Sequence, residues 1–180
     1  VTMELFEYEK QHLETLRQSL AECTVLLKSN GDFPLEAPCK IAAYGCGVRK
    51  TIKGGTGSGE VNSRYFVNVE QGMQYAGFTI TTEKWLDAYD ATYAEAKKAF
   101  RERMKAEAKA HKTNAIVYAM GKAMPEPEYD LLLEGEGDVA IYVLSRISGE
   151  GNDRDPIGGD IRLSAVFSSL RFFTSTSLIL

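Results

Sequence analysis

Three stretches of the chain repeat apolar residues at the spacing of an α-helix. Residues 82–112 form the longest stretch, whose remaining positions are mostly Glu, Lys and Arg, so one long helix with a solvated charged face is predicted. Its apolar stripe consists of Trp85, Tyr89, Tyr93, Ala96, Phe100 and Met104. Residues 5–23 predict a first amphipathic helix from Leu5, His12, Leu13, Leu16, Leu20 and Cys23. Residues 63–77 predict another, with Tyr65, Phe66, Val69 and Met73 on one face and Gly77 as its stop.

Short apolar runs without polar alternation lie between these helices. "KIAAYG" at 40–45 and "DVAIYVLS" at 138–145 read as buried strands, "FTIT" at 78–81 is a weaker candidate, and "TVLLK" at 24–28 is a short β-rich run. Residues 29–38 and 124–130 contain prolines and are expected to be loops. Helices that alternate with unpatterned apolar strands indicate an α/β fold, a mostly parallel sheet with helices on both faces.

Two loops stand where such a sheet binds its ligands. In open α/β sheets, ligands lie beyond the carboxyl ends of the strands. The loops that follow the first and last predicted strands, 45–62 and 145–155, are both rich in glycine and polar residues. We therefore expect functional residues in these two loops.

The glycine-rich loop 45–62 matches none of the common phosphate or nucleophile motifs. Arg49 replaces the glycine that a P-loop needs before Lys50-Thr51, and Lys50 replaces the third glycine of the dinucleotide pattern. Ser58 lacks the outer glycines of a nucleophile elbow. Phosphate binding through backbone N–H groups stays open as an alternative. His12 and His111 have no partner at metal-ligand spacing, so neither a metal nor a cofactor is expected.

Composition narrows the class of protein further. The chain has 180 residues, 44% of them hydrophobic, and a formal net charge of −4, with no block of like charge. Neither nucleic acid nor a membrane is expected as a partner. Three cysteines that form no CxxC spacing favour a reducing compartment, and the start lacks the pattern of a signal peptide, so a cytoplasmic location is expected.

Three segments in order carry a resemblance to a known family. They are "CTVLLKSNGDFPL" at 23–35, "IKGGTGSGEVNSRYF" at 52–66 and "SRISGEGNDR" at 145–154. Together they resemble the α/β-sandwich domain of glycoside hydrolase family 3, the β-glucosidases and their relatives, over roughly residues 3–161. In that family the sandwich packs against a TIM-type barrel, which supplies the aspartate nucleophile.

The resemblance implies a role for each matching residue. Glu150 corresponds to the general acid/base, and Ser58, between Gly57 and Gly59, to a group that reaches the sugar. Arg146, Asp153 and Arg154 are read as residues that shape the loop, although pairing of Glu150 with one of the two arginines is the simpler structural alternative. Hydrolysis with retention needs two carboxyl groups, one of them protonated near neutral pH. The implied substrates are small-molecule or oligosaccharide β-glucosides.

The chain also departs from the family. We expect residues 1–160 to form the sandwich domain, and residues 161–180 an atypical apolar, serine-rich tail of out-of-frame or vector origin. Without a barrel the chain would have no nucleophile of its own. An exposed strand edge would favour a homo-oligomer, with elements swapped between copies or the tail filling the gap. Two alternatives stay open: a non-catalytic carbohydrate-binding or assembly module, and an unrelated hydrolytic or oxidative activity.

Overall fold

The computed structural model describes residues 4–54, 59, 61–64, 66–120, 122, 124–129, 135–147 and 178–179. The chain divides into two compact units, residues 1–36 and 37–180. None of the helices in the described ranges combines the length and the apolar composition needed to cross a membrane.

The first unit contains the helix α1, Glu7–Glu22, as the periodicity predicts. At its start the backbone N–H of Phe6 donates to the Glu9 carboxylate (2.8 Å), which satisfies one N–H group at the helix terminus. The β-rich run that follows, 24–28, is irregular rather than a strand. Within the described part of the chain this run pairs with no strand, and β-propensity alone does not form a strand. Residues 29–36 are turns and loop, as expected.

The second unit is built on a parallel sheet with the strand order β2-β1-β3-β4. Its strands are β1 (Lys40–Tyr44), β2 (Thr79–Ile80), β3 (Val139–Tyr142) and β4 (Leu178–Ile179). The central strand β1 pairs with β2 through Ile41↔Ile80 and with β3 along four residues, ending at Tyr44↔Tyr142. Strand β4, which lies in the expected tail, pairs with β3. The predicted parallel α/β fold is therefore confirmed.

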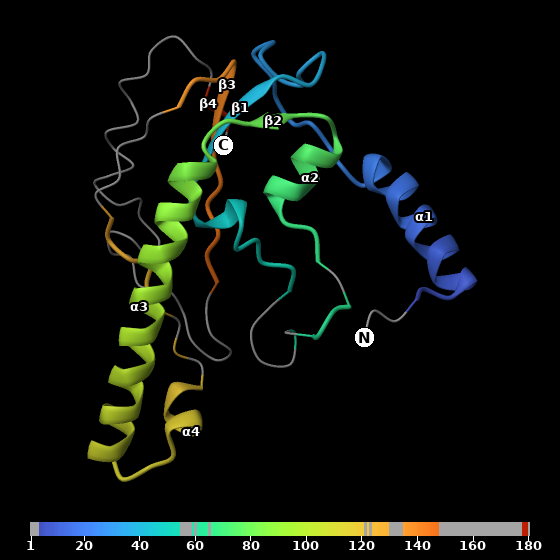
Figure 1. Cartoon of the computed structure of the whole chain (residues 1–180). Helices are drawn as coiled ribbons and strands as arrows, with labels where there is room; N and C mark the ends of the chain where they lie inside the picture. The colour runs from blue at the N-terminus through green and yellow to red at the C-terminus, as the bar shows by residue number, and fades with distance from the viewer. Residues whose placement is uncertain are drawn as a thin grey trace. The chain divides into compact units, whose positions relative to one another are not determined.

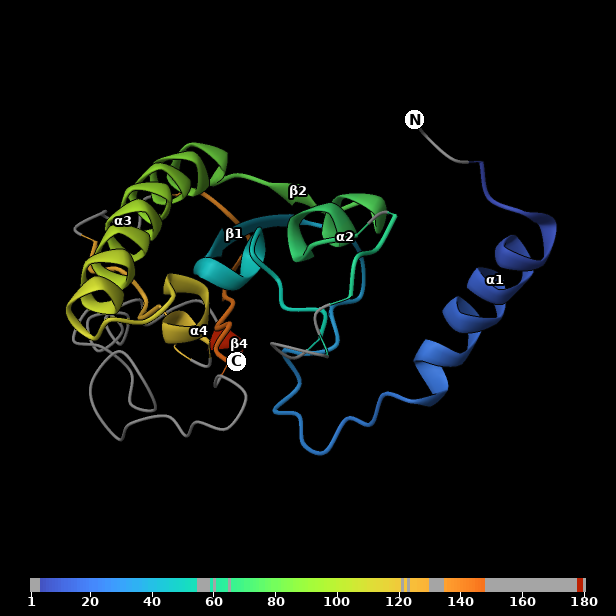
Figure 2. The same cartoon turned by 90° about the horizontal axis from the view of Figure 1, so that it is seen from below.

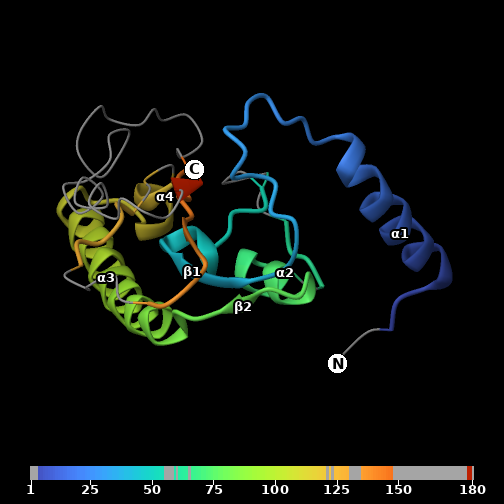
Figure 3. The same ribbon diagram turned by 90° about the horizontal axis from the view of Figure 1, so that it is seen from above.

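Helices α2 (Val69–Tyr75) and α3 (Glu83–Ala110) connect these strands. The chain passes from β1 through α2 to β2, then through α3 and back past β1 to β3. Because both crossovers are right-handed by the general rule, the two helices cover opposite faces of the sheet. Figures 1, 2 and 3 show α2 and α3 on either side of β1.

Helix α3 has the predicted stripe. Trp85, Tyr89 and Met104 are buried and the other three stripe residues are half-buried, whereas the charged positions between them are mostly exposed. The helix ends at Ala110, and the short helix α4, Ala115–Ala119, follows with Asn114 as its cap. The aromatic core is formed by Trp85, which stacks on Tyr89 and meets Tyr44 edge to face.

Helix α2 begins later than predicted. Its cap is Asn68, whose Oδ1 accepts from the N–H of Gln71 (2.8 Å), while Gln71 Oε1 accepts from the N–H of Asn68 (3.1 Å). This capping box starts the helix at Val69, so Phe66 lies before it and does not share a helix face with Met73. Tyr65 lies outside the described residues. Gly77, with φ of +90°, ends the helix as expected.

Candidate functional site

Strands β1 and β3 are neighbours, and their following loops leave the sheet at the same edge. The chain moves from β1 outward to β2 on one side and later to β3 on the other, so a topological switch point lies between β1 and β3. This is the place where open α/β sheets bind ligands. Both loops predicted to carry function, 45–62 and 145–155, begin here.

Hydrogen bonds join the chain just after β3 to the end of β1 and to the loop that follows it. The N–H of Val143 donates to Tyr44 O (2.8 Å), and the N–H of Gly47 donates to Val143 O (3.1 Å). Gly45 has φ of +93°, and a Cβ on it would lie 2.5 Å from Val143 O. Only glycine permits this backbone conformation and this close approach. Further along, Ser145 Oγ donates to Lys50 O (3.3 Å).

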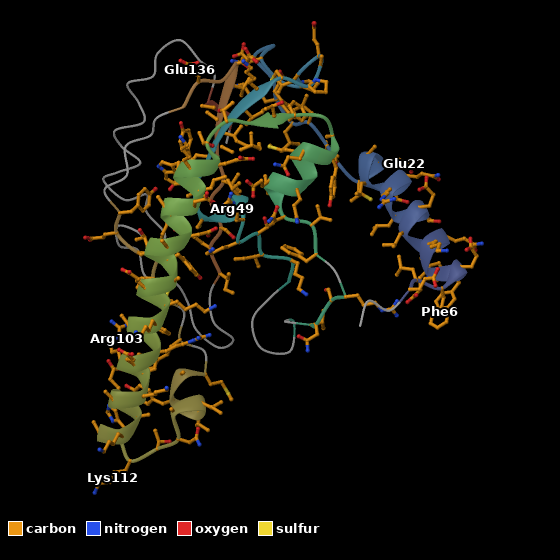
Figure 4. All side chains as sticks on the ribbon, in the orientation of Figure 1. Phe6, Glu22, Arg49, Arg103, Lys112 and Glu136 are labelled. Atoms are coloured by element: carbon orange, nitrogen blue, oxygen red, sulfur yellow. The ribbon has the colours of Figure 1, made fainter. Side chains whose placement is uncertain are left out.

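Arg49 holds the glycine-rich loop to both covering helices. Its Nε and Nη2 donate to the Glu70 carboxylate of α2 at 2.7 and 3.0 Å. Its Nη1 reaches Asp87 (2.6 Å) and Asp90 (3.2 Å) of α3. Hydrogen bonding to Glu70 raises the pKa of the guanidinium, although burial opposes the shift. Figure 4 shows Arg49 between α2 and α3, where it fixes the start of the loop.

The middle of this loop closes on itself. A Cβ on Gly54 would lie 2.7 Å from Gly59 O, and the N–H of Val61 donates to the same oxygen (3.1 Å). Lys53 Nζ donates to Ser63 Oγ (2.6 Å) and to the carbonyl of Val61. The carbonyl of the predicted Gly59 therefore lies against Gly54 and Val61. The predicted Gly57 and Ser58 are outside the described residues.

The segment after β3 begins in a partly buried polar cluster. Arg146 Nη2 lies 3.6 Å from Glu126 Oε2, and the two side chains are 16% and 13% exposed. Tyr89 Oη donates to Glu126 Oε1 (3.2 Å). The Cys46 thiol contacts the carbonyl of Ser145 (3.5 Å), and burial, followed by the charge of Glu126, raises its pKa.

Tyrosines surround this cluster. Tyr129 and Tyr142 share a hydrogen bond of 2.6 Å between their hydroxyls, and Tyr129 meets Tyr89 and Trp85 edge to face. Burial is the main cause that raises the pKa values of Tyr89, Tyr129 and Tyr142. These groups stay protonated and neutral near pH 7 and act as hydrogen-bond partners.

The structure thus describes two of the predicted site residues, Gly59 and Arg146. The predicted Glu150, Asp153 and Arg154 lie outside the described residues, as do Gly57 and Ser58. Sequence reasoning missed Glu126 and Cys46. The signal for Glu126 is its position between two prolines, which remove amide donors and restrict the backbone, so a rigid segment presents the carboxylate. No group of three or more His, Cys, Asp or Glu in the described part of the chain could hold a metal ion.

Comparison with known proteins shows which proteins this chain is similar to. No family model matches the chain. β-Glucosidase A of Butyrivibrio fibrisolvens is 30% identical over 155 residues, which are 84% of this chain and 17% of that protein. The chain also matches β-glucosidase 3B of Thermotoga neapolitana in complex with α-D-glucose, with 29% identity and a TM-score of 0.57 over 90% of this chain.

The chain is a partial domain like that of the family 3 β-glucosidases. It covers 21% of the solved Thermotoga neapolitana chain. A second structure of the same enzyme, in complex with glycerol, is 28% identical with a TM-score of 0.57, over 94% of this chain and 23% of that one. The resemblance predicted from the three sequence segments is thereby confirmed.

Proposed function

We propose that this family 3-like domain supplies the general acid/base, Glu150, to a retaining glycoside hydrolase that acts on β-glucosides. The observation that carries the proposal is the junction of the two loops at the switch point, in a chain related to β-glucosidases. Ser145 and Arg146, the first residues of the "SRISGEGNDR" segment, are bonded to the β1 loop and to Glu126. Glu150 follows only four residues after Arg146.

The chemistry explains the residue types. The acid must protonate the leaving oxygen, and the same residue, once deprotonated, must activate the water that releases the sugar. The second carboxyl group acts as a nucleophile about 5–5.5 Å away. We propose that it comes from another part of the complete enzyme, since this chain spans about a fifth of its solved relatives. Ser58, on the glycine-rich loop, is proposed to bind the sugar.

The test is a chimera in which this chain replaces the matching segment of the Thermotoga neapolitana enzyme. We expect Glu150→Gln to lower hydrolysis of 4-nitrophenyl β-glucoside by roughly 10²–10⁴-fold, the usual contribution of general acid/base catalysis. The loss should be smaller for 2,4-dinitrophenyl β-glucoside, because that leaving group needs less help from an acid. The control Glu136→Gln removes an exposed carboxylate (Figure 4) and should leave the rate unchanged.

Binding provides a second arm. A different pair of results would instead support a carbohydrate-binding module without catalysis. In that case the isolated chain binds glucose more weakly after Ser58→Ala, and Glu150→Gln leaves hydrolysis by the chimera unchanged. Equal losses for both leaving groups would also contradict the role of Glu150 as an acid.

A further inference from the structure

Glu126 is a carboxylate that takes no part in the proposed chemistry, and its two neighbours in the sequence restrict its backbone. Pro125 and Pro127 flank it. Each proline fixes its own φ, and the residue before a proline is pushed into extended backbone. Glu126 itself precedes a proline. Its side chain is only 13% exposed, so its charge requires partners from the surrounding elements.

Those partners come from three separate elements. Tyr89 of α3 donates to Oε1, and Arg146, after β3, faces Oε2. Cys46, after β1, lies close enough for the carboxylate to raise the pKa of its thiol. Glu126 is therefore the point at which α3 and the two loops of the switch point meet.

Arg146 is held at its charged end, and its neighbour Ser145 is held by its hydroxyl and its carbonyl group. Ser145 Oγ donates to Lys50 O, and Ser145 O accepts from the Cys46 thiol. The Glu126 carboxylate adds a charged contact one residue later. Together these contacts fix the direction in which the chain leaves β3.

We infer that Glu126 is a positioning residue for the segment that follows β3 and acts through Arg146, an inference that rests on the proposed function of that segment. Desolvation offsets much of the attraction in a buried ion pair, and an apolar pair of the same volume is often as stable. A charged pair at this site therefore contributes mainly by fixing geometry. Glu126→Gln keeps an oxygen acceptor for Tyr89 and removes only the charge, so we expect it to affect the path of the segment more than the stability of the sheet.

Hydrogen–deuterium exchange on the full chain tests this directly. We expect Glu126→Gln to speed exchange in the peptide that begins at Leu144 by roughly tenfold, which corresponds to local opening rather than global unfolding. Peptides of β1 and β3 should keep their protection. The matched control is Glu128→Gln, which neutralises an exposed carboxylate two residues away and should change nothing.

The partner residue gives the second variant. Arg146→Gln should raise exchange in the same peptide, and the double variant should raise it no further, because both substitutions remove one interaction. An unchanged peptide, additive effects, or equal loss of protection in β1 and β3 would each overturn the inference. The last result would identify Glu126 as a carboxylate that serves overall stability alone.

A kinetic measurement separates this inference from the proposed function. In the chimera, Glu126→Gln should lower kcat for 4-nitrophenyl β-glucoside roughly tenfold with little change in KM, and less for 2,4-dinitrophenyl β-glucoside. A variant with general structural damage would lose both activities equally. If Glu150→Gln shows the dependence on leaving group and Glu126→Gln does not, only the inference about Glu126 is wrong. If Glu150→Gln shows none, the proposed function fails, and exchange in the full chain still decides whether Glu126 positions the segment.

Discussion

Thr82 offers a quantitative test of how the sheet is completed next to the candidate site. Strand β2 pairs with β1 only as far as Ile80↔Ile41, so the next backbone groups of β1 on that side, the N–H and C=O of Ala43, have no strand partner. Thr82 Oγ1 accepts from the N–H (2.9 Å) and donates to the C=O (2.6 Å). The residue is 2% exposed, so water cannot readily replace it.

The magnitude follows from the two groups left unpaired. Thr82→Val keeps the volume of the side chain but leaves both Ala43 groups buried without a partner, at about 1–3 kcal/mol for each. We expect the free energy of unfolding to fall by about 2–6 kcal/mol. Thr82→Ser keeps the hydroxyl and removes one methyl group, so it should cost about 1 kcal/mol.

Urea unfolding followed by the fluorescence of Trp85, the single tryptophan of the chain, measures both variants. Trp85 lies 5.2 Å from the ring of Tyr44 of β1 and reports on this part of the core. With a slope m of about 2 kcal/mol/M, Thr82→Val should lower the midpoint by about 1–3 M. Equal or greater stability of the valine variant relative to the serine variant would refute the reasoning, because burial of apolar surface would then outweigh the two hydrogen bonds.

Three further predictions concern the loops and the cluster. Gly45→Ala should destabilise the chain by more than about 2 kcal/mol in urea unfolding, because its added Cβ meets a backbone carbonyl. The control Gly31→Ala, also at positive φ but in open space, should cost about 1 kcal/mol. Equal losses for the two variants would contradict the clash. Arg49→Met should lower the free energy of unfolding by about 2–3 kcal/mol in the same assay, because Met leaves partly buried carboxylates unpaired, and Arg49→Lys should lower it less. A Met variant as stable as the original chain would show that the ion pairs of Arg49 add no stability. Burial raises the pKa values of Cys46 and Tyr142 in the folded state, so the unfolded chain loses these protons first as the pH rises. The free energy of unfolding should therefore fall above about pH 9, and more steeply above about pH 10. Tyr142→Phe should make that fall shallower, and an unchanged slope would contradict the assignment.

A helix or strand could be predicted where a single local sequence pattern determines it. The apolar stripe of α3 and the apolar run of β1 each indicate the type of element and the side chains that it buries, and both elements are present in the structure. The start of α2 could not be read from apolar spacing, because Phe66 fits the helical period by chance while Asn68 and Gln71 cap the helix two residues later. The N-x-x-Q pair was the better local signal.

The candidate site was only partly accessible from the sequence. Glycine-rich loops after strands and the resemblance to family 3 point to the edge of the sheet where β1 and β3 end. Contacts such as Glu126 with Tyr89, 37 residues apart, and with Arg146 depend on how α3 and the proline-flanked segment pack. No spacing in the chain encodes them, since side chains from three elements meet only after the sheet has formed.

The most direct test of the central claim is the product formed by the Glu150→Gln chimera in the presence of azide. Azide is already an anion, so it can attack a glucosyl-enzyme intermediate without the general base that water requires. The account predicts that azide restores turnover of 2,4-dinitrophenyl β-glucoside and that the product is β-glucosyl azide, with retained configuration. Full activity of the variant without azide, or a loss of activity that azide does not restore while the Glu136→Gln control stays active, would contradict the assignment of Glu150 as the acid/base.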